Sequence, residues 1–368
     1  MTPRTSPSLA APLRVGRIGT CPLKWEHPNA RFVAFCHRRG EEVEKARRLH
    51  GVAGYTDLRE MLAREKLDVL IIKTPTPVHT EHILATLGAG VHVFVDKPLC
   101  ANAAELRAIE EAVARSGRVL QVNFELRNSG LPRRIRDVMA AEGGEPVHFY
   151  WHVMDLGWTT RKSPPKAWKL DAANTGGFIN EKLCHYLDLA AWWLGSPLVR
   201  ISACGAPVIT SGYRGIWDNI SLHAWTARGQ TAWISWSTTA PKWKVSYGGI
   251  VGKRGAVFWD WKLEGQLVNR LQVTRHDTDA EGKMHETVPV RVEDYREGDQ
   301  VALTHDNEGC FAAFVNRLLG RPDDTPYVTA PEAFHLTRLC LAAEESARRR
   351  GEPFDPCEWH EKALRGSG

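Results

Sequence analysis

The chain has 368 residues, of which 43% are hydrophobic and 25% are charged. This length predicts two domains, each large enough to bury its own core, and the apolar content excludes a wholly disordered protein. The net charge of +5 is spread along the chain, which argues against a nucleic-acid-binding protein. No window approaches the roughly 18 uncharged apolar residues of a membrane span.

The N-terminus and the cysteines indicate where the protein works. Residues 1–12 are polar and rich in Pro and Ser, and they lack the apolar stretch of a secretory signal. We therefore expect a flexible tail on a cytoplasmic protein. The 8 cysteines are scattered without a CxxC pair, which is typical of reduced thiols rather than of a disulfide framework. No metal-binding pattern is visible.

Residues 13–126 alternate between short strand-like runs and amphipathic helical stretches. Such alternation predicts a doubly wound parallel sheet of the Rossmann type with helices on both faces. Ligands bind beyond the carboxyl ends of the strands of such a sheet. The expected strands are 13–18, 32–36, 69–72, 92–95 and 119–122, and the expected helices are 41–50, 58–65, 79–87 and 103–115.

The loop after the first expected strand carries Gly16, Gly19 and Thr20, followed by Cys21. A dinucleotide site has the pattern GxGxxG here, because glycine lets the backbone approach the pyrophosphate. Cys21 stands where the next glycine is expected. The crossover to the next strand is close to the minimum length, which predicts a stunted first helix. Both a dinucleotide site and an ordinary glycine turn fit this loop.

The second expected strand ends in His37-Arg38. An acidic side chain at this point would bind the adenosine ribose of NAD, whereas an arginine accommodates the 2′-phosphate of NADP. The absence of an acid favours NADP. The alternative is that these residues form only an exposed basic start of a helix.

Three further strand ends carry candidate site residues. Thr74-Pro75 would shape a tight turn under a nicotinamide ribose. The fourth expected strand runs into Asp96-Lys97, where a following proline fixes the lysine at the end of the strand that faces the ligand crevice. Asn123 ends the last expected strand and is a further candidate for cofactor binding.

Several motifs follow one another along the chain. The Thr-Pro pair at 74–75 is followed by His79, and the run AGVHV at 89–93 leads into the triplet DKP at 96–98. A Gly-Gly pair at 176–177 precedes a predicted helix that holds Glu181 and His185. In this order and spacing the chain resembles the Gfo/Idh/MocA oxidoreductase family over about residues 13–350.

The resemblance implies a dinucleotide-binding Rossmann domain over 13–126 and a substrate-binding and oligomerisation domain over 127–368. The second domain would be an α+β domain with a large, mostly antiparallel sheet. The implied activity is hydride transfer between NADP (or NAD) and a sugar, polyol or similar small molecule. A homodimer or homotetramer is the implied assembly.

The resemblance also implies roles for single residues. Lys97 matches the family's catalytic lysine, with Asp96 in place of the usual glutamate. His185 matches the histidine of a helix in which Glu181 replaces the usual aspartate. His79, with 74–75, matches the loop on the nicotinamide side. Trp168-Lys169 is similar to an element that approaches the cofactor from the second domain.

The sequence beyond residue 126 changes in character. Alternating runs with regular turn spacing predict an antiparallel sheet with several helices. The expected strands are 147–154, 199–204, 219–225, 231–238, 244–251, 256–259 and 267–274, and the expected helices are 132–139, 178–194, 309–319 and 331–349.

Glu181 and His185 are four residues apart, which in an α-helix places both on one face. Glu181 can then orient the imidazole. Hydride removal from an alcohol requires that the hydroxyl proton be taken up. We expect His185 to act as the general base and Lys97 to stabilise the charge on the same oxygen, although the two roles are interchangeable.

The chain has 14 tryptophans. In the expected strand 231–238, Trp233 and Trp236 face opposite sides of the sheet. One side would pack on helices and the other on a partner subunit. Trp151, Trp158 and Trp168 are better candidates for stacking on a ligand ring.

Two other functions fit the same residues. One is a redox-neutral glycoside cleavage or epimerisation with a tightly held cofactor. The other is a member of the family that has lost the cofactor together with its glycine loop and serves as a binding protein or a different catalyst.

Overall fold

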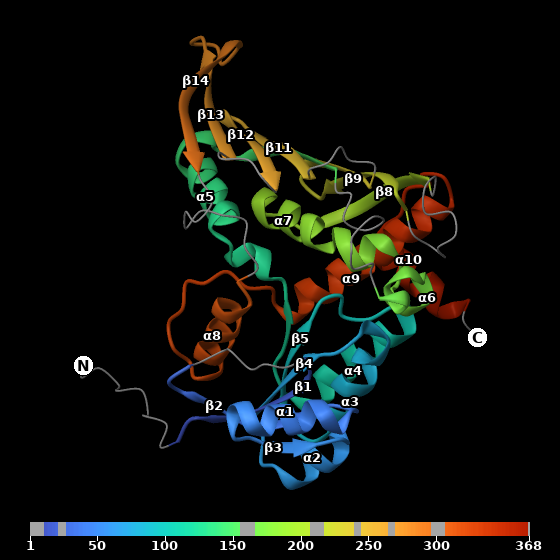
Figure 1. Ribbon diagram of the computed structural model, residues 1–368. Helices are drawn as coiled ribbons and strands as arrows, with labels where there is room; N and C mark the ends of the chain where they lie inside the picture. The colour runs from blue at the N-terminus through green and yellow to red at the C-terminus, as the bar shows by residue number, and fades with distance from the viewer. Residues whose placement is uncertain are drawn as a thin grey trace, which may run out of the picture. The chain divides into compact units, whose positions relative to one another are not determined.

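A computed structural model describes residues 11–20, 27–154, 166–206, 217–238, 244–263, 269–295 and 306–366 (Figure 1). The chain divides into two compact units, each assembled from separate segments. The first comprises Met1–Leu99, Arg107–Asn123 and Asn307–Ala330. The second comprises Cys100–Leu106, Phe124–Asp306 and Pro331–Gly368.

The first unit is built on a parallel sheet with the strand order β3-β2-β1-β4-β5-β6. Its strands are almost continuously apolar, as expected for strands that helices cover on both faces. They are β1 (Leu13–Gly19), β2 (Ala30–Cys36), β3 (Ala53–Tyr55), β4 (Val69–Lys73), β5 (His92–Asp96) and β6 (Leu120–Asn123). The accompanying helices are α1 (Gly40–His50), α2 (Leu58–Arg64), α3 (His79–Gly88), α4 (Ala103–Ser116) and α8 (Asn307–Leu318).

Helix α8 completes the core of the first unit, although it lies nearly 200 residues beyond β6 in the sequence. Phe311 and Phe314 are buried against Val15, Val69 and Phe94 of the sheet. The ring of Phe94 lies 5.7 Å from that of Phe311 and 5.4 Å from that of Phe314. These aromatic contacts close one face of the sheet.

The second unit contains an eight-stranded sheet with the order β14-β13-β12-β11-β7-β10-β9-β8. Only β7 and β10 pair in parallel, so among the described residues this sheet is mostly antiparallel. Its strands are β7 (Pro146–Met154), β8 (Leu198–Ala206), β9 (Asn219–Thr226), β10 (Thr231–Ser237), β11 (Lys244–Gly252), β12 (Gly255–Leu263), β13 (Asn269–Thr278) and β14 (Met284–Tyr295).

Helices cover one side of this second sheet (Figure 1). They are α5 (Gly130–Val138), α6 (Ala172–Thr175), α7 (Cys184–Leu194), α9 (Ala330–Arg348) and α10 (Pro356–Arg365). Short 3-10 helices span Glu125–Asn128 and Ala167–Leu170, and π-helical turns span Met139–Gly143 and Ile179–Leu183. Gly195 ends α7 in the left-handed conformation, as its position in the sequence predicts.

An aromatic cluster forms the centre of the second unit. Trp151 is fully buried, its indole N–H donates to Ser246 at 2.6 Å, and its ring packs edge-on against Tyr186 and Trp259. The expectation that Trp151 stacks on a ligand ring is therefore wrong, because the ring is part of the core. Trp236 is buried while Trp233 is half-buried, so the two do face opposite sides of β10.

The predicted fold class is confirmed: a Rossmann sheet is followed by a large, mostly antiparallel sheet. Among the described α-helices and strands, four were missed, namely β3, β14, α6 and α10. β3 is only three residues long, and β14 has alternating charged and apolar residues around Pro289, which obscured it. Pro289 is compatible with β14 because this strand lies at the edge of the sheet. The expected stunted helix falls partly on 21–26, outside the described residues.

Candidate functional site

Gly19 lies at the carboxyl end of β1, where a bound dinucleotide would approach the chain. Its φ is +114°, and a Cβ at this position would overlap the carbonyl of Lys73. Only glycine therefore fits here. The bare backbone at this strand end suits the close approach of a pyrophosphate. Thr20 follows and accepts a hydrogen bond from Arg17 at 2.9 Å, while Cys21 lies outside the described residues.

The turn after β2 presents one arginine for a ligand. Arg39 pairs with Glu41 at 3.3 Å and with Glu42 at 3.1 Å. The backbone N–H of His37 donates to the carbonyl of Tyr55. Arg38 is exposed, and no described residue forms a hydrogen bond or an ion pair with its side chain. Its guanidinium group is thus available for a phosphate, as the sequence predicts for a 2′-phosphate.

His79 joins the loops that follow β4 and β5. It is 1% exposed, and its ring nitrogens lie 2.8 Å from the carbonyl of Thr74 and 2.9 Å from the carbonyl of Pro98. Both contacts are hydrogen bonds only when both nitrogens carry a proton, because carbonyl oxygens only accept. His79 therefore braces the Thr74-Pro75 turn against the residue that follows Lys97.

A polar network occupies the carboxyl ends of β4, β5 and β6. Asn123 donates to Asp96 at 3.3 Å and to Asn307 at 2.6 Å, and Lys73 lies 3.5 Å from Asp96. Lys97 follows Asp96 directly. The side-chain oxygen of Asn123 is buried with no hydrogen-bond partner among the described residues. An unpaired acceptor at this edge fits a ligand that brings its own donor.

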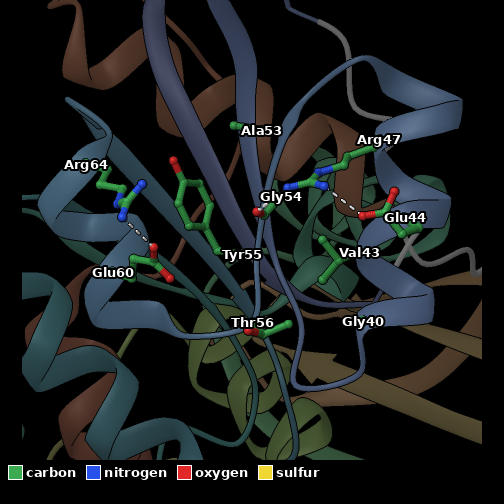
Figure 2. A pocket seen from close by; sticks show the side chains of 10 residues that line it. All are labelled: Gly40, Val43, Glu44, Arg47, Ala53, Gly54, Tyr55, Thr56, Glu60 and Arg64. Carbon is green, nitrogen blue, oxygen red and sulfur yellow. Dashed lines mark hydrogen bonds and ion pairs between the residues drawn. The ribbon is translucent and has the colours of Figure 1, made fainter.

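A pocket of about 460 Å³ opens at the sheet edge between α1, β3 and α2 (Figure 2). Figure 2 shows that its charged side chains pair with one another, Arg47 with Glu44 at 2.7 Å and Arg64 with Glu60 at 3.1 Å. The pocket therefore presents little uncompensated charge to a phosphate. The strand ends described above remain the candidate cofactor site.

His185 is the second residue of α7 and lies in a buried, charged environment. Its Nε2 is 3.7 Å from Oε1 of Glu125, and the edge of the Phe124 ring contacts the imidazole. The side chains of Glu125 and His185 are both 7% exposed. One turn further along, Asp188 accepts hydrogen bonds from Nε and Nη2 of Arg127 at 2.9 and 2.7 Å. Burial raises the pKa of Asp188, and the adjacent guanidinium opposes that rise.

Glu181 lies in the π-helical turn that precedes α7. It is 3% exposed and accepts a hydrogen bond from Lys169 at 2.7 Å. The ammonium of Lys169 also lies 5.2 Å from the centre of the Trp168 ring. The structure thus brings together three residues that the sequence singled out, Trp168, Lys169 and Glu181. The spacing argument assumed a regular α-helix at Glu181, and the π turn changes that geometry.

The Gly-Gly pair lets a buried carboxylate reach the start of this helix. Gly177 has a φ of +100°, and a Cβ there would overlap the carboxyl group of Glu344 from α9. Glu344 accepts hydrogen bonds from the backbone N–H of Ile179 and from the indole of Trp217. Burial raises the pKa of Glu344 to about 7, although both hydrogen bonds oppose the rise. Sequence analysis missed Glu344 because it comes from a helix more than 160 residues away.

Among the described residues, no group of three or more His, Cys, Asp or Glu side chains is arranged to hold a metal ion. None of the described helices is both long and apolar enough to cross a membrane. Trp158, a stacking candidate, lies outside the described residues.

Comparison with known proteins places both units in one family. Residues 15–124 match the profile described as "Oxidoreductase family, NAD-binding Rossmann fold", and residues 115–258 match that of the GFO/IDH/MocA C-terminal domain. A relative named scyllo-inositol 2-dehydrogenase (NAD(+)), from Bacillus subtilis, is 25% identical over 92% of this chain and 93% of its own length. An inositol 2-dehydrogenase from Rhizobium meliloti is 28% identical over 67% of this chain and 73% of its own.

Solved structures share the fold at lower identity. An oxidoreductase domain protein from Kribbella flavida superposes with a TM-score of 0.73 at 20% identity, covering 94% of this chain and 99% of its own. The WlbA dehydrogenase from Bordetella pertussis, in complex with NADH and UDP-GlcNAcA, has a TM-score of 0.71 at 18% identity, covering 93% and 97%. Together with the profile matches, the two sheets and the motif order show that the chain belongs to the GFO/IDH/MocA oxidoreductase family.

Proposed function

We propose that the protein transfers a hydride between NADP, or NAD, and a sugar, polyol or sugar-like alcohol or ketone. The observation that carries this proposal is the match of both units to one NAD-binding oxidoreductase family. Two relatives that cover most of this chain are named as inositol dehydrogenases, which supports a polyhydroxylated ring as substrate. A small molecule of this kind, rather than a macromolecule, is the proposed partner.

Lys97 and His185 are the proposed acid/base pair. In the oxidation direction, His185 takes the hydroxyl proton while the carbon loses a hydride, so the alcohol becomes a ketone. The cationic Lys97 stabilises the negative charge that develops on the oxygen. A bound nicotinamide supplies the hydride acceptor. In the reverse direction, His185 returns the proton to the new alkoxide.

The proposed cofactor site follows the strand ends of the first unit. Gly19 with Thr20 and Cys21 would border the pyrophosphate, and Thr74-Pro75, braced by His79, would border the nicotinamide ribose. Asp96 and Asn123 line the same edge. Trp168 and Lys169 complete the proposed set from the second unit.

The preference for NADP rests on the exposed Arg38, which follows β2 where an NAD site would carry an acid. Since the Bacillus subtilis relative is named for NAD(+), the two chains would differ in the preferred cofactor. Replacing Arg38 with Ala should weaken NADPH binding about tenfold or more and change NADH binding less than twofold. Energy transfer from tryptophan to the reduced nicotinamide measures both affinities.

Arg39→Ala is the matched control, because this neighbour is already paired with Glu41 and Glu42. It should leave both affinities within twofold. Equal losses for the two cofactors in Arg38→Ala would refute the phosphate role. Failure of the unmodified protein to bind either cofactor would refute the proposed function itself.

A further inference from the structure

We propose that Glu125 is the carboxylate that orients His185 and stabilises its protonated form, a positioning role that the sequence pattern assigns to Glu181. This inference rests on the proposed function of His185. Glu125 belongs to the 3-10 helix Glu125–Asn128, which directly follows Phe124. The motif pattern of the chain does not include this residue.

Glu125 and His185 lie close together, and both side chains are buried. Oε1 of Glu125 lies 3.7 Å from Nε2 of His185, within ion-pair distance, and both side chains are 7% exposed. Opposite charges at this separation interact strongly when little water screens them. Phe124 packs edge-on against the imidazole from the same segment, with ring centres 5.9 Å apart. The short segment 124–125 therefore supplies both a carboxylate and an aromatic ring beside His185.

Glu181 has a different arrangement. Its Oε1 accepts a hydrogen bond from Lys169 at 2.7 Å, so its charge is offset by an ammonium group. Glu181 also lies in the π-helical turn Ile179–Leu183, whereas His185 lies in α7, which follows that turn. Glu181 is therefore better suited to holding the Trp168-Lys169 segment in place than to stabilising a positive charge on the imidazole of His185.

Besides Glu125, charged groups lie on the elements that carry Glu125 and His185 and on those next to them. Glu125 and Arg127 come from the same 3-10 helix, and Asp188 comes from α7 itself. Arg127 donates hydrogen bonds to Asp188 through Nε and Nη2, and it lies 3.5 Å from Glu332 of α9. The π turn contributes Glu181 and Lys182, whose ammonium lies 5.3 Å from the centre of the Trp236 ring.

Arg127 offsets the charge of Asp188, and the carboxylate of Glu125 lies within ion-pair distance of His185. The imidazolium that forms when His185 takes up the hydroxyl proton of the substrate is therefore stabilised by the adjacent carboxylate.

The test is the pH dependence of kcat/KM for alcohol oxidation in Glu125→Gln and Glu181→Gln. The general base must be unprotonated, so activity falls on the acidic side of the profile. Loss of the carboxylate in Glu125→Gln should move this acidic limb down by about one pH unit and lower kcat about tenfold or more. KM for the cofactor should change less than threefold. Glu181→Gln should leave the position of the limb unchanged.

Glu111→Gln, which removes an exposed carboxylate on α4, controls for the loss of one negative charge. Glu125→Asp restores the charge on a shorter side chain, so its limb should lie between those of the unmodified protein and Glu125→Gln. If Glu125→Gln does not bind cofactor, the inference is tested by comparing the acidic limb of Glu125→Asp with that of the unmodified protein.

An unmoved limb in the Glu125 variants, or a moved limb in Glu181→Gln, overturns the inference while leaving the proposed function intact. If the unmodified protein binds neither NADPH nor NADH, the proposed function fails first.

Discussion

Lys97 and His185, the proposed acid/base pair, both have neighbours that are held by specific contacts. Lys97 lies between Asp96, which is held by Asn123, and Pro98, whose carbonyl contacts the buried His79. His185 lies beside Glu125 in a segment almost without solvent exposure. The residues on both sides of Lys97 and the imidazole of His185 are thus held by contacts within their own units.

Replacing Lys97 or His185 with Ala should each lower kcat by at least a thousandfold, because one removes charge stabilisation and the other proton transfer. Affinity for the cofactor should stay within a few-fold. Steady-state kinetics and the fluorescence titration measure the two effects separately. Lys45→Ala, on the exposed surface of α1, serves as the control for loss of a lysine. Full activity in either variant would remove that residue from the mechanism.

At the residue scale, motif positions could be predicted, but several of their partners could not. Lys97 was recognisable because it follows a strand and precedes a proline. Asn307, which contacts Asn123, and Glu344, which reaches Ile179, lie 184 and 165 residues from those partners. No periodicity in one sequence specifies such pairs, because they depend on how distant elements pack.

At the level of elements, the π turn and the Gly-Gly pair act together with α9. Gly177 leaves room for the Glu344 carboxyl group, and that group accepts the N–H of Ile179 at the start of the turn. Orphan N–H groups at helix starts require such acceptors. The helix that carries Glu181 and His185 is thereby anchored to α9.

This anchor predicts a specific pH dependence of stability. The Glu344 carboxyl has a raised pKa of about 7 in the folded protein, compared with its ordinary 4.5 when unfolded. The folded state therefore binds the proton more tightly, so its stabilising contribution is complete below pH 4.5 and is lost as pH rises through 7. The loss amounts to about 3 kcal/mol.

Urea unfolding of the unmodified protein and of Glu344→Gln, at intervals between pH 4.5 and 8, measures this effect. The variant cannot titrate, so the difference between the two free energies of unfolding should change across this range. Gln also places an NH₂ group near two donors, which adds a constant offset but no slope. A difference that is independent of pH would contradict the assignment.

Sequence patterns predicted the regular elements well and the irregular ones poorly. The apolar runs at 69–72 in β4 and 93–95 in β5 are continuous, so the type and position of these strands were readable. The turn Ile179–Leu183 has helical composition, and nothing in it distinguishes a π turn from an α turn. The turn contacts Glu344 through Ile179 and Lys169 through Glu181, and such tertiary contacts are not visible in a local sequence pattern.

At the scale of the whole molecule, β14 is an uncovered edge of the second sheet among the described strands. Val288, Val290 and Val292 alternate along it and are 38%, 43% and 51% exposed. Exposed apolar side chains that lie together mark sites of contact with other protein surfaces. The family resemblance implies a homodimer or homotetramer, and we propose that β14 contributes to that contact.

Light scattering coupled to size-exclusion chromatography tests this proposal. The unmodified protein should elute as a dimer or tetramer, and Val290→Lys should shift it towards the monomer. Leu49→Lys, at an exposed apolar position on α1, should leave the mass unchanged. A monomeric unmodified protein at micromolar concentration would contradict the proposal.

The late position of α8 in the sequence has a consequence for how the chain is made. Phe311 and Phe314 cover Val15, Val69 and Phe94, which a ribosome synthesises more than 200 residues earlier. During translation this apolar surface stays open to solvent until most of the polypeptide has emerged. The nascent chain therefore presents a hydrophobic surface that chaperones can recognise. A transcript truncated before codon 307 would yield a protein without α8, so Phe311 and Phe314 would not cover this surface.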